Sequence, residues 1–371
     1  MGWTINDIKL RIIHFEKMKK NETNQNKITL LDETIGSLYE ILDYFEAEIY
    51  TEPTTFKETR KMDDEFISHY YKLNHIICDF ADRFSYCKLP FKKYCTVDRR
   101  IKRDKILTVT KDFYMSIKDE RFTTPFLDLY SKNRKYVNFR PTTKENSKIN
   151  DAITFQVYNT PEVFMSINEL NTIQDYLATV HEYSHAVAFR INKDHAIDFG
   201  KYPFTEVDSI FFEMLCNESL QQTNKSDALV ADIDRFFDYA LYALIIQSKL
   251  YLYSYMRQNK GLKMKDIKRF LSKDLDLPYD AIDDVLHKYI YEMYNYVISY
   301  LVAIELLLMY KKQPQKALDA LYELVSLSEL SSLEYLALLK DKYEIVPGEN
   351  TQIYYDSLVS RKRGLQYAKK I

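Results

Sequence analysis

Residues 179–185 read Thr-Val-His-Glu-Tyr-Ser-His (TVHEYSH) and lie inside a helical pattern that runs from about residue 169 to residue 189. Side chains four residues apart share one face of a helix, with Cβ atoms roughly 5–6 Å apart. His181 and His185 can therefore hold one ion together. Glu182 lies one residue further round the helix, where it can reach a water molecule on that ion. The stretch predicts a metal site on a helix, with a carboxylate beside it.

This HExxH arrangement is typical of zinc peptidases. A catalytic zinc ion takes three protein ligands and keeps one position open for water, so a third ligand should follow on another helix. Residues 204–209 (FTEVDS) supply it, because Thr205 can cap a helix and Glu206 then falls in its first turn. The 25 residues from His181 to Glu206 are enough to end one helix, form a loop and return antiparallel.

Neighbouring residues leave alternatives open. Glu213 lies seven residues beyond Glu206 on the same helical face, where it can accept the second ring N–H of a ligand histidine and fix its tautomer. Asp208 is expected to face another side of this helix. His195, in the loop between the two helices, is an alternative ligand. Glu206 itself has an alternative role as a first-turn acid that stabilises the helix dipole.

The composition favours long helices over a many-stranded sheet. The 371 residues include only 6 Gly and 9 Pro, which repeated tight turns require. The 52 basic and 54 acidic residues leave a formal net charge of −2, so no global field draws the chain to nucleic acid or anionic lipid. The most apolar stretch, residues 294–310, contains Asn295, Ser299 and Glu305 and is shorter than a membrane span. We therefore expect a buried helix there.

The cysteines and the first residues bear on the compartment. Cys78, Cys87, Cys95 and Cys216 show no CxxC spacing, which predicts free thiols rather than a disulfide framework. Residues 1–20 are charged and hold no apolar core of signal-peptide length. We expect a soluble protein in a reducing, cytoplasmic compartment, without a nucleic-acid or membrane partner. The sequence predicts no particular oligomeric state.

Apolar spacing gives a coarse view of the elements. Intervals of three and four residues predict helices over residues 28–49 and 63–84. Residues 125–139 are expected to form two short strands joined by a turn. Residues 153–158 (ITFQVY) are β-branched and aromatic and predict another strand. After about residue 166 the spacing is helical again.

The sequence resembles the thimet oligopeptidase and oligoendopeptidase F family of zinc metallopeptidases, which are gluzincins with a glutamate downstream of HExxH. The resemblance is carried by HEYSHA at residues 181–186 and by FTEVDSIFFE at residues 204–213. Supporting segments are FLDLYSKNRKY (126–136), ITFQVYN (153–159), HKYIYEMYNY (287–296) and SSLEYLALLKDKYEIVP (331–347). It covers about residue 126 to the end, and Ser184 departs from it because the family usually has glycine there.

This resemblance implies a fold. The fold class is mainly α, a zincin-like helical bowl with a small β-sheet beside the active-site helix and a deep cleft between two lobes. Residues 1–120 would form an N-terminal helical lobe. Residues 121–371 would form the catalytic region, with the sheet and the C-terminal helices. The cleft would restrict substrates to short, unstructured peptides.

The resemblance also implies roles for particular residues. His181, His185 and Glu206 would bind one Zn²⁺ ion, with Glu182 as general base and Glu213 behind a ligand histidine. The substrate carbonyl or the oxyanion would be met by residues further along the chain, namely His287 with one or more of Tyr289, Tyr294 and Tyr296. The edge strand would bind the peptide through Phe155, Val157 and Asn159.

The leading hypothesis is a zinc-dependent endopeptidase acting on oligopeptides, in which Glu182 takes a proton from the zinc-activated water and later returns it to the leaving amine. Two alternatives remain. One is a catalytically silent peptide-binding protein that keeps the fold. The other is a helical interaction protein in which HEYSH is coincidental, and this protein would contain no stoichiometric zinc.

Overall fold

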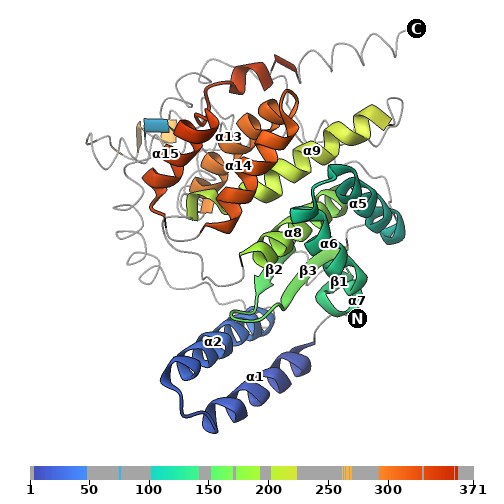
Figure 1. The fold of residues 1–371 in the computed structure, drawn as a ribbon, viewed down its shortest axis with the longest axis vertical. Helices are drawn as coiled ribbons and strands as arrows, with labels where there is room; N and C mark the ends of the chain where they lie inside the picture. The colour runs from blue at the N-terminus through green and yellow to red at the C-terminus, as the bar shows by residue number, and fades with distance from the viewer. Residues whose placement is uncertain are drawn as a thin grey trace.

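The computed structural model describes residues 4–47, 75–76, 102–141, 152–169, 173–192, 202–223, 261, 263, 265–266, 268–269, 292–327, 330–354 and 356–357. Within these ranges the chain is mainly helical and holds one three-stranded sheet (Figure 1). The mainly α class with a small sheet is thereby confirmed, whereas the cleft stays a prediction. No helix in these ranges combines the length and the apolar character that a membrane crossing requires.

The described chain starts with a helical hairpin. α1 (Ile5–Lys20) begins after Thr4, whose side chain and backbone form a reciprocal capping pair with Asp7. α2 (Gln25–Ala47) packs along α1 and confirms the first predicted helix. The helix predicted for residues 63–84 lies outside the described residues, apart from residues 75–76.

Of the two strands predicted over residues 125–139, the first is wrong, whereas the second is confirmed by β1 (Val137–Pro141). α6 (Glu120–Ser131) and the short α7 (Asn133–Tyr136) occupy most of this stretch. Phe122, Phe126 and Leu129 are fully buried. Their spacing places them on one face of a helix, and that face packs against its neighbours despite the proline inside α6. Burial of a helical stripe therefore outweighs the local strand-like composition.

The helix before α6 belongs to the same core. α5 (Arg103–Ile117) packs against α6 and also against α8 (Ile173–Ile191), the helix that carries the HExxH residues. Its buried residues Phe113 and Tyr114 belong to the main hydrophobic cluster. The division of the chain at residue 120 stays a prediction.

The sheet has the order β1-β3-β2. β3 (Val163–Glu169) runs parallel to β1 (Val137–Pro141) and antiparallel to β2 (Ala152–Gln156). β2 overlaps the strand predicted for residues 153–158 but begins and ends earlier, and β3 corrects the expectation of helical structure after residue 166. Residues 163–167 are all buried, because β3 is the central strand, and it therefore lacks the alternation that marks a half-exposed strand.

The remaining helices enclose the site. α9 (Val207–Thr223) follows a 3₁₀ turn at Tyr202–Phe204 and packs against α8. α13 (Glu292–Tyr310) packs against both α9 and α14 (Pro314–Ser326), and α15 (Ser332–Tyr343) packs against α14 (Figure 1). The main core thus lies between the sheet, α8, α9 and these C-terminal helices.

Asp119 and Arg121 form an ion pair at the start of α6. Asp119 caps α6 by accepting the Arg121 N–H at 3.0 Å, and the Arg121 guanidinium also contacts Asp319 of α14 at 2.7 Å. Hydrogen bonds from the Arg121 side chain hold the pKa of Asp119 below its usual value. A depressed pKa means that this carboxylate stabilises the fold above about pH 3.9 and loses that contribution as the pH falls through the folded-state value.

We therefore expect Asp119→Asn, which keeps a capping oxygen but no charge, to lower the free energy of unfolding near neutral pH by about 1–2 kcal/mol. The loss should shrink as the pH falls toward about 3. Urea unfolding across this pH range measures it. Asp104→Asn, at an exposed first-turn acid of α5, is the matched control. Equal pH slopes for Asp119→Asn and the native chain would contradict the prediction.

Candidate metal centre

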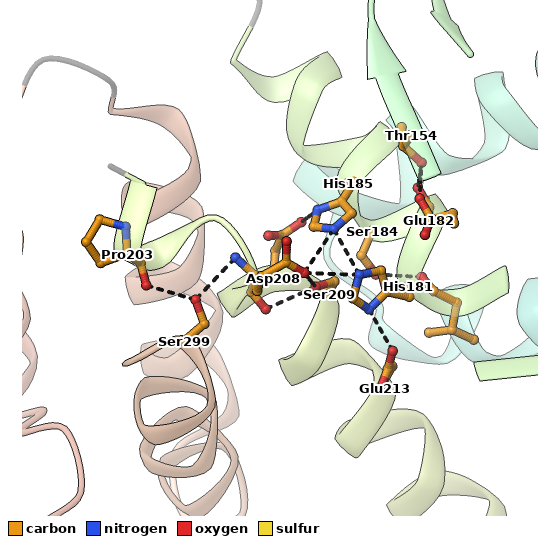
Figure 2. A network of polar contacts seen from close by, with 12 residues as sticks. Thr154, His181, Glu182, Ser184, His185, Pro203, Asp208, Ser209, Glu213 and Ser299 are labelled. Carbon is orange, nitrogen blue, oxygen red and sulfur yellow. Dashed lines mark hydrogen bonds and ion pairs between the residues drawn. The ribbon is translucent and has the colours of Figure 1, made fainter. Parts of the chain in front are cut away.

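The two histidines of the HExxH pattern lie side by side on α8 (Figure 2). Val180, Tyr183 and Val187 of this helix are almost fully buried in the main core. That packing fixes the rotation of α8 and leaves His181 and His185 on the face toward α9. Their side chains are only 16% and 15% exposed.

Three possible ligand atoms converge on one point. Glu206 Oε2 lies 3.1 Å from His181 Nε2 and 3.4 Å from His185 Nε2, and the two ring nitrogens are 3.0 Å apart. Tetrahedral zinc with bonds of about 2.0–2.2 Å places its ligand atoms about 3.3–3.6 Å from one another. The observed separations agree within a few tenths of an ångström. Two imidazoles and a carboxylate are also a donor set of catalytic zinc sites, so these residues fit one metal ion.

Two further carboxylates lie behind the histidines. Glu213 Oε1 is 2.7 Å from His181 Nδ1, and Asp208 Oδ2 is 3.5 Å from His185 Nδ1. An imidazole that donates its Nδ1–H to a carboxylate keeps the lone pair of Nε2 free for a metal. The place of Asp208 corrects the expectation that it faces elsewhere.

Burial and charge oppose each other in this cluster. Burial alone lowers the pKa of His181, but hydrogen bonds with Glu206 and Glu213 outweigh it and hold the pKa well above its ordinary value. The pKa of His185 is likewise lowered by burial yet rises to about 10 through Glu206 and Asp208. Burial alone would raise the pKa of Glu206, but the two histidines hold it far below its usual value. The centre therefore attracts positive charge, and a metal ion has to displace protons to bind.

Glu206 is mounted on the turn that leads into α9. Its carbonyl accepts the Ile210 N–H at 3.0 Å, which makes it the residue before the first helical position rather than a member of the first turn. The Ser209 hydroxyl contacts the Glu206 carbonyl at 3.0 Å and its carboxylate at 3.4 Å. Glu206 therefore directly precedes α9 instead of lying in its first turn, and Thr205, the predicted cap, lies one residue earlier.

Glu182 points away from the ligands toward the sheet (Figure 2). The hydroxyl of Thr154 on β2 lies 2.5 Å from the Glu182 carboxylate and 3.1 Å from its main-chain oxygen. Burial raises the pKa of Glu182 despite the nearby histidines and Thr154. No signal in the sequence pointed to Thr154, since the contact joins a strand to a helix 28 residues later.

The other expected substrate residues are only partly described. His287, Tyr289 and the alternative ligand His195 lie outside the described residues. Tyr294 lies in α13, and Tyr296 in the same helix is 38% exposed.

Tyr300 of α13 was not among the tyrosines predicted from the sequence. Burial raises the pKa of Tyr300 well above its usual value, and the negative charges of Glu213 and Glu206 add to this effect. Tyr300 lies one helical turn beyond Tyr296 in α13, and this spacing could have predicted that the two side chains share a helical face.

The helical hairpin occupies part of the predicted peptide-binding strand. β2 ends at Gln156, and Val157 is fully buried in a cluster with apolar residues of α1 and α2, against which Phe155 also packs. Asn159 donates hydrogen bonds to the Leu30 carbonyl at 3.1 Å and to Glu33 at 2.9 Å. All three proposed peptide contacts thus have partners within the chain.

Glu213 provides the second prediction. Outer partners of metal-bound histidines typically contribute 10–100-fold to metal affinity. We expect Glu213→Ala to weaken zinc binding by about this factor. The zinc affinity of Glu213→Gln should lie between those of the native protein and Glu213→Ala, because the amide oxygen still accepts the His181 N–H. Competition with a chromogenic chelator measures the affinity.

Glu218→Ala is the matched control, since Glu218 also lies on α9 but pairs with Lys311 at 3.0 Å. Equal zinc affinities of Glu213→Ala and Glu218→Ala would contradict the role of Glu213.

Solved structures share this architecture. A structure assigned to oligoendopeptidase F superposes with a TM-score of 0.54 at 12% identity, over 97% of this chain and 68% of the other. A protein from Chlamydophila abortus assigned as a peptidase gives 0.53 at 13% identity, over 96% and 63%. PZ peptidase A with an inhibitor gives 0.53 at 13% identity, over 95% and 66%.

The chain therefore spans about two thirds of the length of these proteins. No protein-family model matches the sequence, and no curated protein matches it. Identities this low establish the fold and leave the activity to be argued from the site. The expectation drawn from HEYSHA and FTEVDSIFFE is confirmed at this level, since the chain has the fold of the oligoendopeptidase F structures.

Proposed function

We propose that the protein is a zinc-dependent metalloendopeptidase that hydrolyses peptide bonds in short, unstructured oligopeptides. One observation carries this proposal. Nε2 of His181, Nε2 of His185 and a carboxylate oxygen of Glu206 converge within 3.4 Å of one another. The fold adds support, because the neighbours of known structure are described as oligoendopeptidase F and as peptidases.

The residues of the site have separate tasks. His181, His185 and Glu206 would hold the zinc ion, while Glu213 keeps the His181 ring in the tautomer that presents Nε2 and Asp208 lies 3.5 Å behind His185. When bound, zinc makes a water molecule more acidic and polarises a carbonyl group. Glu182 accepts the proton of the attacking water and delivers it to the leaving amine. Its buried setting, which raises its pKa, suits a group that has to carry a proton for part of the cycle.

Other parts of the proposal concern the substrate. His287, Tyr289, Tyr294 and Tyr296 remain the candidates for binding the substrate carbonyl or the oxyanion. Phe155 on β2 remains a candidate for contact with the peptide. The protein is proposed to act in the cytoplasm, in keeping with the buried free thiol of Cys216.

Cleavage-site profiling of a diverse peptide mixture tests the proposal. We expect cleavage by the zinc-loaded protein, loss of cleavage with a chelator, and recovery when zinc is returned. Peptide binding without cleavage by the zinc-loaded protein would instead favour a silent peptide-binding protein. A purified protein without stoichiometric zinc would contradict both.

A further inference from the structure

We propose that Ser299 is a positioning residue for the metal centre. From α13 it fixes the turn on which Glu206 is mounted, and it thereby sets the affinity of the centre for zinc. The inference rests on the proposed function only in taking zinc as the metal. It concerns a residue that belongs neither to the HExxH pattern nor to the helix carrying the third ligand.

Ser299 bonds to the backbone on both sides of this turn (Figure 2). Its hydroxyl donates to the Pro203 carbonyl at 3.0 Å and accepts the Glu206 N–H at 3.2 Å. Pro203 lies within the 3₁₀ segment and Glu206 immediately precedes α9. One side chain therefore clamps the short connection whose geometry decides where the Glu206 carboxylate lies.

The Glu206 N–H needs a partner from outside its own helix. The N–H groups at a helix start have no intrahelical acceptor. The Ser209 hydroxyl and the Ile210 N–H both bond to the Glu206 carbonyl, so α9 already holds the carbonyl group of Glu206. Ser299 holds the other side, and without it the carboxylate can swing about the entry to the helix.

The setting of Ser299 shows that its hydroxyl is specifically placed. Ser299 is fully buried, and Val297, Ile298, Leu301 and Val302 around it are at most 1% exposed. A hydroxyl in such an apolar helix is unfavourable unless it is hydrogen-bonded. Ser299 is one of the polar residues that interrupt the apolar stretch 294–310. Its hydroxyl bonds to the turn that carries Glu206.

The same helix faces the centre in another way. Tyr300, the next residue, is close enough to Glu206 and Glu213 for their charges to raise its pKa further. α13 therefore supports the third ligand through Ser299. Metal affinity and the position of this helix are linked through one hydroxyl.

Zinc affinity of Ser299→Ala, measured by chelator competition with zinc alone, tests the inference. We expect a 10–100-fold loss, as for other residues that orient a ligand. Ser37→Ala is the matched control. Ser37 is also buried, donates to a carbonyl (Thr34, 2.8 Å) and accepts an N–H (Tyr158, 3.2 Å), but it lies in the helical hairpin. It should leave zinc affinity unchanged.

Ser299→Cys provides a second measurement if Ser299→Ala does not fold, because a thiol fills the same place with weaker hydrogen bonds. It should show an intermediate loss of zinc affinity. Native affinity in Ser299→Ala, or in Ser299→Cys where only that variant folds, would overturn the inference. Equal losses in Ser299→Ala and Ser37→Ala would do the same.

Zinc binding and peptide cleavage can be tested separately. If the native protein binds one zinc ion, loses affinity on Ser299→Ala and cleaves no peptide, the proposed function is wrong and the role of Ser299 stands. A native protein that binds no zinc overturns both.

Discussion

Glu182→Gln should abolish most peptide cleavage while leaving the fold and the zinc content intact. A positioned general base contributes about 10²–10⁴-fold to rate, and the amide cannot accept the proton of the attacking water. We therefore expect kcat to fall by about this factor with little change in KM. Cleavage of a quenched peptide, together with metal analysis of the same sample, measures both quantities.

The contact with Thr154 makes this variant a conservative one. The Thr154 hydroxyl can still bond to the side-chain oxygen of the introduced glutamine, so the side chain should keep its place beside β2. Glu162→Gln is a matched control, because Glu162 lies in the turn between β2 and β3 and pairs with Arg11 and Lys135. Unchanged turnover in Glu182→Gln would exclude Glu182 as the base.

Much of this centre could be predicted from sequence because its spacing is local. His181 and His185 are four residues apart in one helix, so the helix alone brings them together. Glu213 lies two turns along α9 from the third ligand and was found by the same reasoning. Helical periodicity is sufficient wherever the two residues belong to one helix.

The remainder depends on contacts between elements. Asp208 was expected to face away from the centre, but it lies beside His185, whereas Glu213 contacts His181. Thr154 and Ser299 reach the site from a strand and from α13, and no spacing in the sequence encodes such approaches. The same holds for the fold, where burial against α5 and α8 makes residues 120–131 helical.

Removal of the third ligand should have the largest effect on the metal. Glu206→Ala leaves two imidazoles, and we expect its zinc affinity to fall by more than the roughly 100-fold limit for residues that only orient a ligand. The carboxylate also balances the charge of the two histidines, whose pKa values it raises. Its loss therefore removes a donor and a negative charge together, and peptide cleavage should disappear with the zinc.

Thermal and chemical unfolding with and without zinc separates this effect from misfolding. A ligand that binds only the folded state at 100 times its Kd raises the free energy of unfolding by about 2.7 kcal/mol. The native protein should show this gain, and Glu182→Gln should show it as well, because Glu182 is not among the three converging residues. Glu206→Ala should show almost none at the same free zinc. A full zinc-dependent gain in Glu206→Ala would mean that the ion is held elsewhere, and the three-residue centre would have to be abandoned.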